Sequence, residues 1–237
     1  MGPLLVGAYL WGAVPAAYLM AKRARGMDIR GYGSGSVGAT NLLRLTSRRV
    51  AGPVFVFDIL KGILVVWAAW RLGLGATEQM IVGLAAVCGH NWPVFMRFHG
   101  GRGVLTSAGA VFMVALLNGI VPQSTLAVLG AALLSLVLIS MYAVKKGPVG
   151  IFILFVCFPV LGLVFRVPLG LNLALLGLFL VLIVRRLTAP QPIEVAAMSR
   201  GQRLLNRLLF DRDIREKAVW MALVAEQEKR NRRAGSE

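Results

Sequence analysis

Residues 89–104 read Gly-His-Asn-Trp-Pro-Val-Phe-Met-Arg-Phe-His-Gly-Gly-Arg-Gly-Val and form a polar stretch inside a strongly apolar chain. Both histidines of the protein, His90 and His99, lie in this stretch, and apolar segments flank it on both sides. Ionisable side chains and irregular backbone at membrane depth are costly unless they line a cavity or are buried in protein. The stretch therefore predicts a functional site set among membrane-spanning helices.

The glycines near the end of this stretch favour the binding of an anion. They allow backbone N–H groups to turn toward a bound anion, and the arginine between them offers a planar set of donors. The helix expected to begin near Val104 directs its positive end to the same place. The alternative is a cytoplasmic loop in which the glycines only make a tight turn. The candidate phosphate ligands are Gly100, Gly101, Arg102, Gly103 and Thr106.

The composition indicates an integral membrane protein. Hydrophobic residues make up 57% of the 237 residues, charged residues only 15%, and the mean hydropathy is +0.73. The formal net charge of +16 comes from basic residues in the loops between apolar segments and in the C-terminal tail. We therefore expect anionic lipid headgroups or anionic substrates as partners rather than nucleic acid. Cys88 and Cys157 lie inside apolar runs, so the sequence predicts neither a metal site nor a disulfide framework.

Apolar segments separated by polar loops predict an all-α fold, a polytopic membrane bundle of seven transmembrane helices. Basic residues gather in the loop 21–50, at Lys145 and Lys146, and at Arg185 and Arg186, which places these parts on the cytoplasmic side. The N-terminus is then outside and the C-terminus inside, and both glycine-rich loops face the cytoplasm. The expected spans are residues 3–20, 51–72, 79–89, 106–121, 125–144, 149–165 and 169–184.

The chain divides into three expected parts. Residues 1–186 form the seven-span membrane domain, residues 187–225 an amphipathic cytoplasmic segment, and residues 226–237 a charged tail without predicted order. Arginines and leucines alternate with helical spacing around residues 200–217, which predicts a helix lying on the lipid headgroups. Packing of this helix beneath the bundle, near the site, is the alternative.

A second run of small polar residues reads Gly-Ser-Gly-Ser-Val-Gly-Ala-Thr-Asn over residues 33–41. Backbone N–H groups, hydroxyls and an amide in such a run can surround an anion. A flexible linker is the alternative, but a linker does not require the sequence Thr-Asn-Leu-Leu-Arg that ends this run. The candidate ligands are Gly33, Ser34, Gly35, Gly38, Thr40, Asn41 and Arg44.

The second expected span contains two opposite charges, Asp58 and Lys61. Three residues apart, they share one helix face and can pair, which lowers the cost of burying either charge. A structural ion pair and a pair on the substrate side of the helix fit the spacing equally well.

Three motifs in this order resemble the bacterial membrane acyltransferases of the PlsY family, the acyl-phosphate:glycerol-3-phosphate acyltransferases. They are residues 33–41, the sequence Asp-Ile-Leu-Lys-Gly over residues 58–62, and residues 89–95 together with 100–104. The resemblance spans about residues 1–210. It implies seven spans, an active site open to the cytoplasm at a bacterial inner membrane, no cofactor and no need for acyl-CoA.

The reaction that this resemblance implies is the first acylation of phospholipid synthesis. Acyl phosphate and sn-glycerol 3-phosphate give 1-acyl-glycerol 3-phosphate, a lysophosphatidic acid, and phosphate is released. The resemblance places catalytic groups at Ser34, Arg44, His90 and Arg102, and a substrate-binding arginine of a third motif at Arg207.

The chain departs from the family pattern at several of these positions. Ser36 stands where the family usually has Asn, and Arg102 where it usually has Lys. The His and Asn of the third family motif are replaced by Gly201 and Leu204. Neither histidine is followed by Asp at the fifth position, so the His-x-x-x-x-Asp dyad of acyl-CoA-dependent acyltransferases is absent.

Other functions compete with this one. A transporter, or a non-catalytic protein that binds lipids or anions, could use the same basic recess, and so could a divergent, inactive family member. The sequence has no repeated half with matching interrupted helices, which counts against the transporter.

Overall fold

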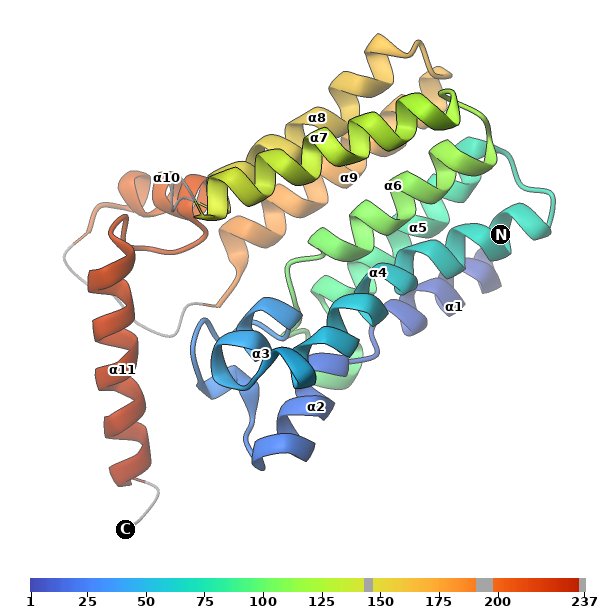
Figure 1. The fold of residues 1–237 in the computed structure, drawn as a ribbon. Coiled ribbons are helices and arrows are strands. Elements are labelled where there is room, and N and C mark those ends of the chain that lie inside the picture. Colours follow the sequence, from blue (N-terminus) through green and yellow to red (C-terminus); the bar gives the residue numbers. More distant parts are fainter. Residues whose placement is uncertain (143–146, 191–197, 235–237) are drawn as a thin grey trace.

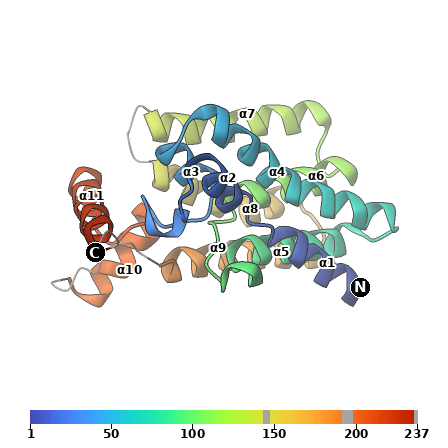
Figure 2. The ribbon, with the colours of Figure 1, turned by 90° about the horizontal axis from the view of Figure 1, so that it is seen from below.

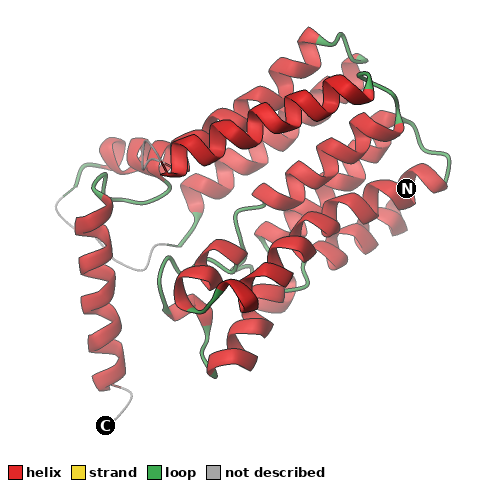
Figure 3. Cartoon of the chain, viewed as in Figure 1, coloured by secondary structure: helices red, strands yellow, loops and turns green. Residues whose placement is uncertain are grey.

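The structure is a computed structural model and describes residues 1–142, 147–190 and 198–234. The described residues are all-helical and contain no strand (Figure 3), as the sequence predicts. Helices α1 and α4 to α9 pack side by side as a bundle (Figure 1), and the start of α1 and helix α11 lie toward opposite ends of the molecule (Figure 2). The elements are α1 (Gly2–Gly12), α2 (Ala16–Arg25), η1 (Ile29–Gly31), α3 (Ala39–Leu45), α4 (Arg48–Arg71), α5 (Ala76–Asn91), η2 (Val94–Met96), α6 (Val104–Leu117), α7 (Gln123–Tyr142), α8 (Gly147–Val164), α9 (Leu169–Thr188), α10 (Arg200–Phe210) and α11 (Lys217–Ala234).

Each of the seven expected spans coincides with one helix or a pair of helices. Among the described residues, three segments are long and apolar enough to cross a membrane: Gly2–Arg25, Arg48–Arg71 and Leu169–Thr188. Helix α6 and most of α8 are apolar but shorter. Seven crossings therefore stay a prediction, and Lys145 and Lys146, two of its topology markers, lie outside the described residues.

The first expected span differs from a continuous helix. Helix α1 ends at Gly12, and α2 begins at Ala16 with Pro15 as its N-cap. Proline lacks a backbone N–H and its ring clashes with the preceding helical turn, so a helix interior at this position is interrupted. At the interruption, the Val14 carbonyl oxygen accepts hydrogen bonds from the Ala16 N–H (3.0 Å) and from Lys61 Nζ on α4 (2.8 Å).

Glycines let the central helices approach one another closely. A Cβ atom at Gly12 would lie 2.0 Å from the Ala86 carbonyl oxygen, so α1 and α5 touch through their backbones. A Cβ atom at Gly62 on α4 would likewise lie 2.1 Å from the Thr106 carbonyl oxygen on α6. Helices in lipid gain little from the hydrophobic effect and associate through such close packing. These contacts hold the end of α1 against the second half of α5 and the middle of α4 against the start of α6.

The C-terminal helices α10 and α11 lie at the same end of the bundle as α2 and α3 (Figure 1). Helix α10 packs on α8 and α9 and exposes Leu204 and Leu205 on its outer face. It ends at Phe210 because Asp211 adopts a left-handed conformation (φ 57°). Helix α11 runs to Ala234 and so includes much of the stretch for which composition predicts no order.

A buried polar cluster joins α4 to the interrupted first span and to α5. The Lys61 ammonium group has three N–H donors and three acceptors: Val14 O at 2.8 Å, Asp58 Oδ1 at 3.0 Å and His90 Nδ1 at 3.4 Å. Lys61 and Asp58 are only 2% and 3% exposed. A buried charge is tolerable only when it is paired and hydrogen-bonded. The cluster meets this condition because the ammonium group has one acceptor from each of three parts of the chain: α4, α5 and the interruption between α1 and α2.

Replacing Gly62 should destabilise the bundle. We expect Gly62→Ala to cost about 1–3 kcal/mol, because the added methyl group overpacks the α4–α6 contact. The control is Gly52→Ala on the same helix, where a Cβ atom would meet nothing within 4 Å; alanine is the better helix former there. Thermal unfolding of the detergent-solubilised protein measures both. Equal unfolding temperatures for the two variants would contradict the close approach.

Removing the Lys61 charge should destabilise the protein more than removing the whole pair. Lys61→Met leaves Asp58 buried without its partner, a change that costs about 3–5 kcal/mol in buried pairs. In Lys61→Met/Asp58→Asn no uncompensated charge remains, so the loss should be smaller than for Lys61→Met alone. Denaturant unfolding in detergent would compare the three proteins. A double variant less stable than Lys61→Met would show that the pair is not the source of the effect.

Candidate active site

A cavity of about 240 Å³ lies where the two glycine-rich stretches meet the cluster and the C-terminal segment. Its wall comes from the loop before α3 and from α3 itself, from Asp58 within α4, from the end of α5 and the start of α6, from α8 and the end of α9, and from the segment between α10 and the start of α11. The polar residues that line it are Ser34, Ser36, Thr40, Asn41, Arg44, Asp58, His90, Arg102, Arg186, Asp211, Arg212 and Lys217.

Asn41 organises the first glycine-rich loop. Its Oδ1 accepts a hydrogen bond from the Ser34 N–H (2.9 Å), and its Nδ2 donates to the carbonyl oxygens of Tyr32 (3.0 Å) and Ser36 (3.1 Å). Gly33 has a positive φ of 59°, and a Cβ atom there would lie 2.3 Å from Asn41 Oδ1. The loop therefore curls around the Asn41 side chain, which holds the residues facing the cavity in place.

The second glycine-rich turn is closed against the end of α5. The Gly101 N–H donates to the His90 carbonyl oxygen (3.0 Å), and a Cβ atom at Gly101 would lie 2.0 Å from His90 Nε2. Gly103 has a positive φ of 72°, which favours glycine, and serves as the N-cap of α6. The turn can therefore take this path only with small residues on both sides of Arg102, whose side chain reaches the cavity.

His90 faces the cavity from the buried cluster. Its Nδ1 lies 3.4 Å from Lys61 Nζ and 3.6 Å from Asp58 Oδ1. An ammonium group can only donate, so a hydrogen bond from Lys61 requires an unprotonated Nδ1 and leaves the proton of the neutral ring on Nε2. This tautomer directs an N–H donor toward the side of the ring next to Gly101.

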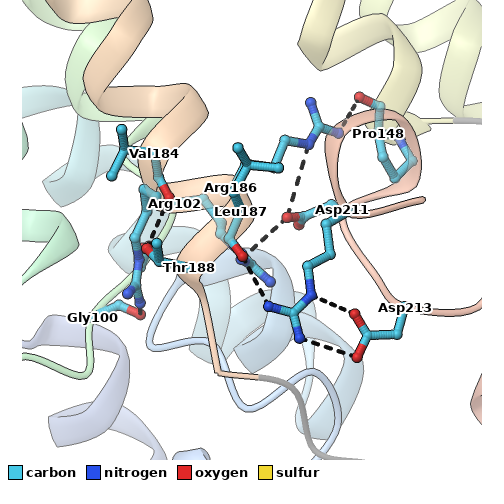
Figure 4. A network of polar contacts seen from close by, with 12 residues as sticks. Gly100, Arg102, Pro148, Val184, Arg186, Leu187, Thr188, Asp211 and Asp213 are labelled. Carbon is cyan, nitrogen blue, oxygen red and sulfur yellow. Dashed lines mark hydrogen bonds and ion pairs between the residues drawn. The ribbon is translucent and has the colours of Figure 1, made fainter. Parts of the chain in front are cut away.

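Positive charge dominates the cavity, with Asp211 in its midst. Arg102 Nη1 lies 3.1 Å from Asp211 Oδ1, and Arg186 Nε lies 3.9 Å from the same oxygen (Figure 4). Partial burial lowers the pKa of Arg212; the charge of Arg44 lowers it further, and Asp211 acts in the opposite direction. The cavity can therefore hold an anion of greater charge than one carboxylate.

The structure brings most of the predicted site residues to one cavity but leaves some outside. Arg207 is turned away: it pairs with Asp213 and donates to the Leu187 carbonyl oxygen (2.8 Å). The predicted residues that line the cavity are Ser34, Gly38, Thr40, Asn41, Arg44, Asp58, His90, Arg102 and Gly103. Those absent from its wall are Gly33, Gly35, Lys61, Gly100, Gly101, Thr106 and Arg207.

The predicted residues outside the cavity have structural contacts. Thr106 is fully buried, and its hydroxyl donates to the Asp58 carbonyl oxygen (2.9 Å). Lys61 holds the cluster behind His90. Gly201 and Leu204, which replace the third-motif His and Asn, are exposed on α10 and do not line the cavity.

Sequence reasoning missed Arg186 and Asp211 as cavity residues. Arg186 is buried at the end of α9, donates to the Pro148 carbonyl oxygen and approaches Asp211 (Figure 4). In the sequence it reads as a topology marker, since basic residues commonly end an apolar span on the cytoplasmic side. The signal in the sequence for a further role was the pair of arginines, because one basic residue is enough to mark the cytoplasmic end of a span. No local pattern distinguishes Asp211 from the other charges of the tail.

Known proteins resemble this chain over most of its length. A family model described as glycerol-3-phosphate acyltransferase matches residues 3–191. Glycerol-3-phosphate acyltransferase 4 of Dehalococcoides mccartyi (strain CBDB1) is 38% identical over 224 residues, 92% of this chain and 91% of that protein. A glycerol-3-phosphate acyltransferase of Thermoanaerobacter sp. (strain X514) is 50% identical over 114 residues, 48% of this chain and 57% of that protein.

Two solved structures share the fold. They are crystal structures of PlsY, an integral membrane glycerol 3-phosphate acyltransferase, in its glycerol 3-phosphate form and its lysophosphatidic acid form. Their TM-scores are 0.66 and 0.63, each at 28% identity over 77% of this chain and 86% of the other. These matches favour a membrane enzyme over a transporter. The chain therefore belongs to the glycerol-3-phosphate acyltransferase family.

Proposed function

We propose that this protein transfers an acyl chain from acyl phosphate to the 1-hydroxyl of sn-glycerol 3-phosphate. The hydroxyl oxygen bonds to the acyl carbon, the bond between that carbon and the phosphate oxygen breaks, and 1-acyl-glycerol 3-phosphate and phosphate leave. The hydroxyl proton is transferred to the leaving phosphate, which is released as hydrogen phosphate. The observation that carries the proposal is one cavity lined by both glycine-rich stretches, by His90 and by four arginines.

The chemistry asks mainly for positioning and for charge stabilisation. An acyl phosphate is already activated, so the enzyme has to hold two anions with the hydroxyl facing the acyl carbon. It also has to stabilise charge as it shifts to the leaving phosphate. Arg44, Arg102 and Arg186 are suited to the phosphoryl oxygens, because guanidinium groups bind phosphate through paired N–H donors. Ser34 and His90 supply further donors at the same cavity.

Asp211 competes with substrate for Arg102 in this proposal. Its carboxylate contacts Arg102 in the structure (Figure 4), and a phosphoryl group offers the same kind of acceptor. Binding of a phosphate at Arg102 therefore displaces Asp211 from this arginine. Because Asp211 also lies near Arg186, its carboxylate retains a positively charged neighbour after displacement.

The proposed setting is a bacterial inner membrane that the chain crosses seven times, with its N-terminus outside and its active site facing the cytoplasm. Basic residues are frequent in residues 21–50, at the end of α9 and in α10, and such segments commonly face the cytoplasm. Residues 21–50 and the end of α9 also contribute to the wall of the cavity. The acyl donor then reaches the cavity from the bilayer and glycerol 3-phosphate from the cytoplasm. Anionic lipid headgroups are the expected neighbours of α10.

Cysteine labelling tests the orientation. On a background lacking Cys88 and Cys157, we expect Ser36→Cys to resist an impermeant thiol reagent added to intact cells and to react after permeabilisation. Gln123→Cys, at the exposed start of α7, should react from outside. Labelling of Ser36→Cys in intact cells would overturn the cytoplasmic site.

Arg102 is the residue whose loss should matter most for turnover. A charge-assisted hydrogen bond contributes about 1.5–3 kcal/mol, so Arg102→Ala should lower kcat/KM roughly ten- to more than a hundredfold. Arg102→Lys should recover a large part, because it restores the positive charge. Arg49→Ala, exposed and outside the cavity, is the control. Acyl transfer from labelled acyl phosphate to glycerol 3-phosphate measures all four proteins, and full activity of a folded Arg102→Ala protein would show that the phosphate binds elsewhere.

A further inference from the structure

Arg185 is a buried arginine whose side chain is absent from the cavity wall. It lies in the last turn of α9 and is only 3% exposed. Its guanidinium donates from Nε to the Gly101 carbonyl oxygen (2.8 Å) and from Nη2 to the Gly100 carbonyl oxygen (2.7 Å). One planar group therefore holds two successive carbonyls of the turn that carries Arg102.

The Gly100 carbonyl oxygen has a second donor, which comes from the other glycine-rich stretch. The Val37 N–H donates to it at 3.3 Å. The loop of residues 33–41, the turn of residues 100–103 and α9 thus meet at one oxygen atom. Side chains from both glycine-rich stretches line the cavity, so their separation across it depends on this junction.

The Arg185 guanidinium also lies near an aromatic ring. Its Cζ lies 5.9 Å from the centre of the Trp92 ring, and the Trp92 carbonyl oxygen accepts a hydrogen bond from the Tyr9 hydroxyl (2.6 Å). A buried carbonyl that loses its donor carries the full cost of desolvation. Without Arg185, the Gly101 carbonyl would therefore drive the turn to rearrange, and Arg102 is the next residue.

We propose that Arg185 is a positioning residue that sets the two glycine-rich stretches at a fixed separation and thereby aims Arg102 at the substrate phosphate. The last clause rests on the proposed function; the structural part does not. Arginine is required for its shape, because a planar fork spans two neighbouring carbonyls, whereas the single ammonium of lysine keeps the charge without the fork.

Two variants and a control test this role in the full-length protein. Arg185→Met keeps the length and apolar stem of the side chain but removes the donors, and Arg185→Lys keeps the charge. Arg71→Met is the control, since Arg71 is exposed at the far end of α4. Hydrogen exchange of peptides covering residues 34–40 and 98–104 reports the order of both stretches. The kcat and KM values for acyl transfer report whether the Arg102 side chain is correctly oriented toward the substrate.

We expect Arg185→Met to raise exchange about tenfold or more in both stretches and to lower kcat more than it raises KM. Arg185→Lys should lie between Arg185→Met and wild type in both measurements, and Arg71→Met should match wild type. Unchanged exchange in Arg185→Met would overturn the proposal. So would full recovery by Arg185→Lys, because charge alone would then suffice.

The outcomes separate this inference from the proposed function. If Arg185→Met does not fold, the comparison of Arg185→Lys with wild type decides: reduced protection in both stretches supports the role, and wild-type protection overturns it. A wild-type protein that transfers no acyl chain would refute the proposed function. The exchange data would still test whether Arg185 holds the two glycine-rich stretches together at the Gly100 carbonyl oxygen.

Discussion

The need to satisfy backbone polar groups among apolar helices governs this structure. A non-helical turn inside such a bundle leaves carbonyl and N–H groups without intrahelical partners. Lipid cannot form hydrogen bonds with these groups, so other parts of the protein have to supply the partners. The Gly100 carbonyl oxygen accepts hydrogen bonds from the Val37 N–H and from Arg185 Nη2, and the Gly101 N–H donates to the His90 carbonyl oxygen. In the interrupted first span, the Val14 carbonyl oxygen accepts a hydrogen bond from Lys61. Val37, Arg185 and Lys61 reach these groups from distant parts of the chain. The polar interior is thus what joins the helices at the end where the cavity lies.

Charge is arranged in two layers around the cavity. The inner layer, Asp58 with Lys61 and His90, is balanced, because every donor of the ammonium has an acceptor. The outer layer, with four arginines around Asp211, carries an excess of positive charge. An excess of this kind destabilises an empty site and is relieved by a bound anion. The balanced layer can serve folding, while the unbalanced layer is suited to binding a substrate.

The C-terminal segment contributes part of the cavity wall, and the residues that do so are not those of the third family motif. Asp211 and Arg212 line the cavity, whereas Gly201 and Leu204 are exposed on α10. Arg207, matched to a family arginine by sequence, instead pairs with Asp213 and donates to the Leu187 carbonyl oxygen at the end of α9. The sequence did not show which residues of this segment would line the cavity, because the faces of α10 alternate within a few residues and the wall is formed by its last residue and the residues after it.

The sequence by itself determined the all-helical membrane fold and the two glycine-rich stretches, because apolar periodicity and glycine chemistry are local properties. Nine of the candidate site residues line the cavity of the structure. The sequence also predicted the Asp58–Lys61 pairing from their spacing on one helix. Only the tertiary structure decided that Asn41 and Arg185 support the two stretches from behind, that Arg186 and Asp211 enter the cavity and that Arg207 does not. The Arg185–Gly100 contact joins residues 85 positions apart in the chain, and local patterns carry no information about which distant carbonyl a buried donor will meet.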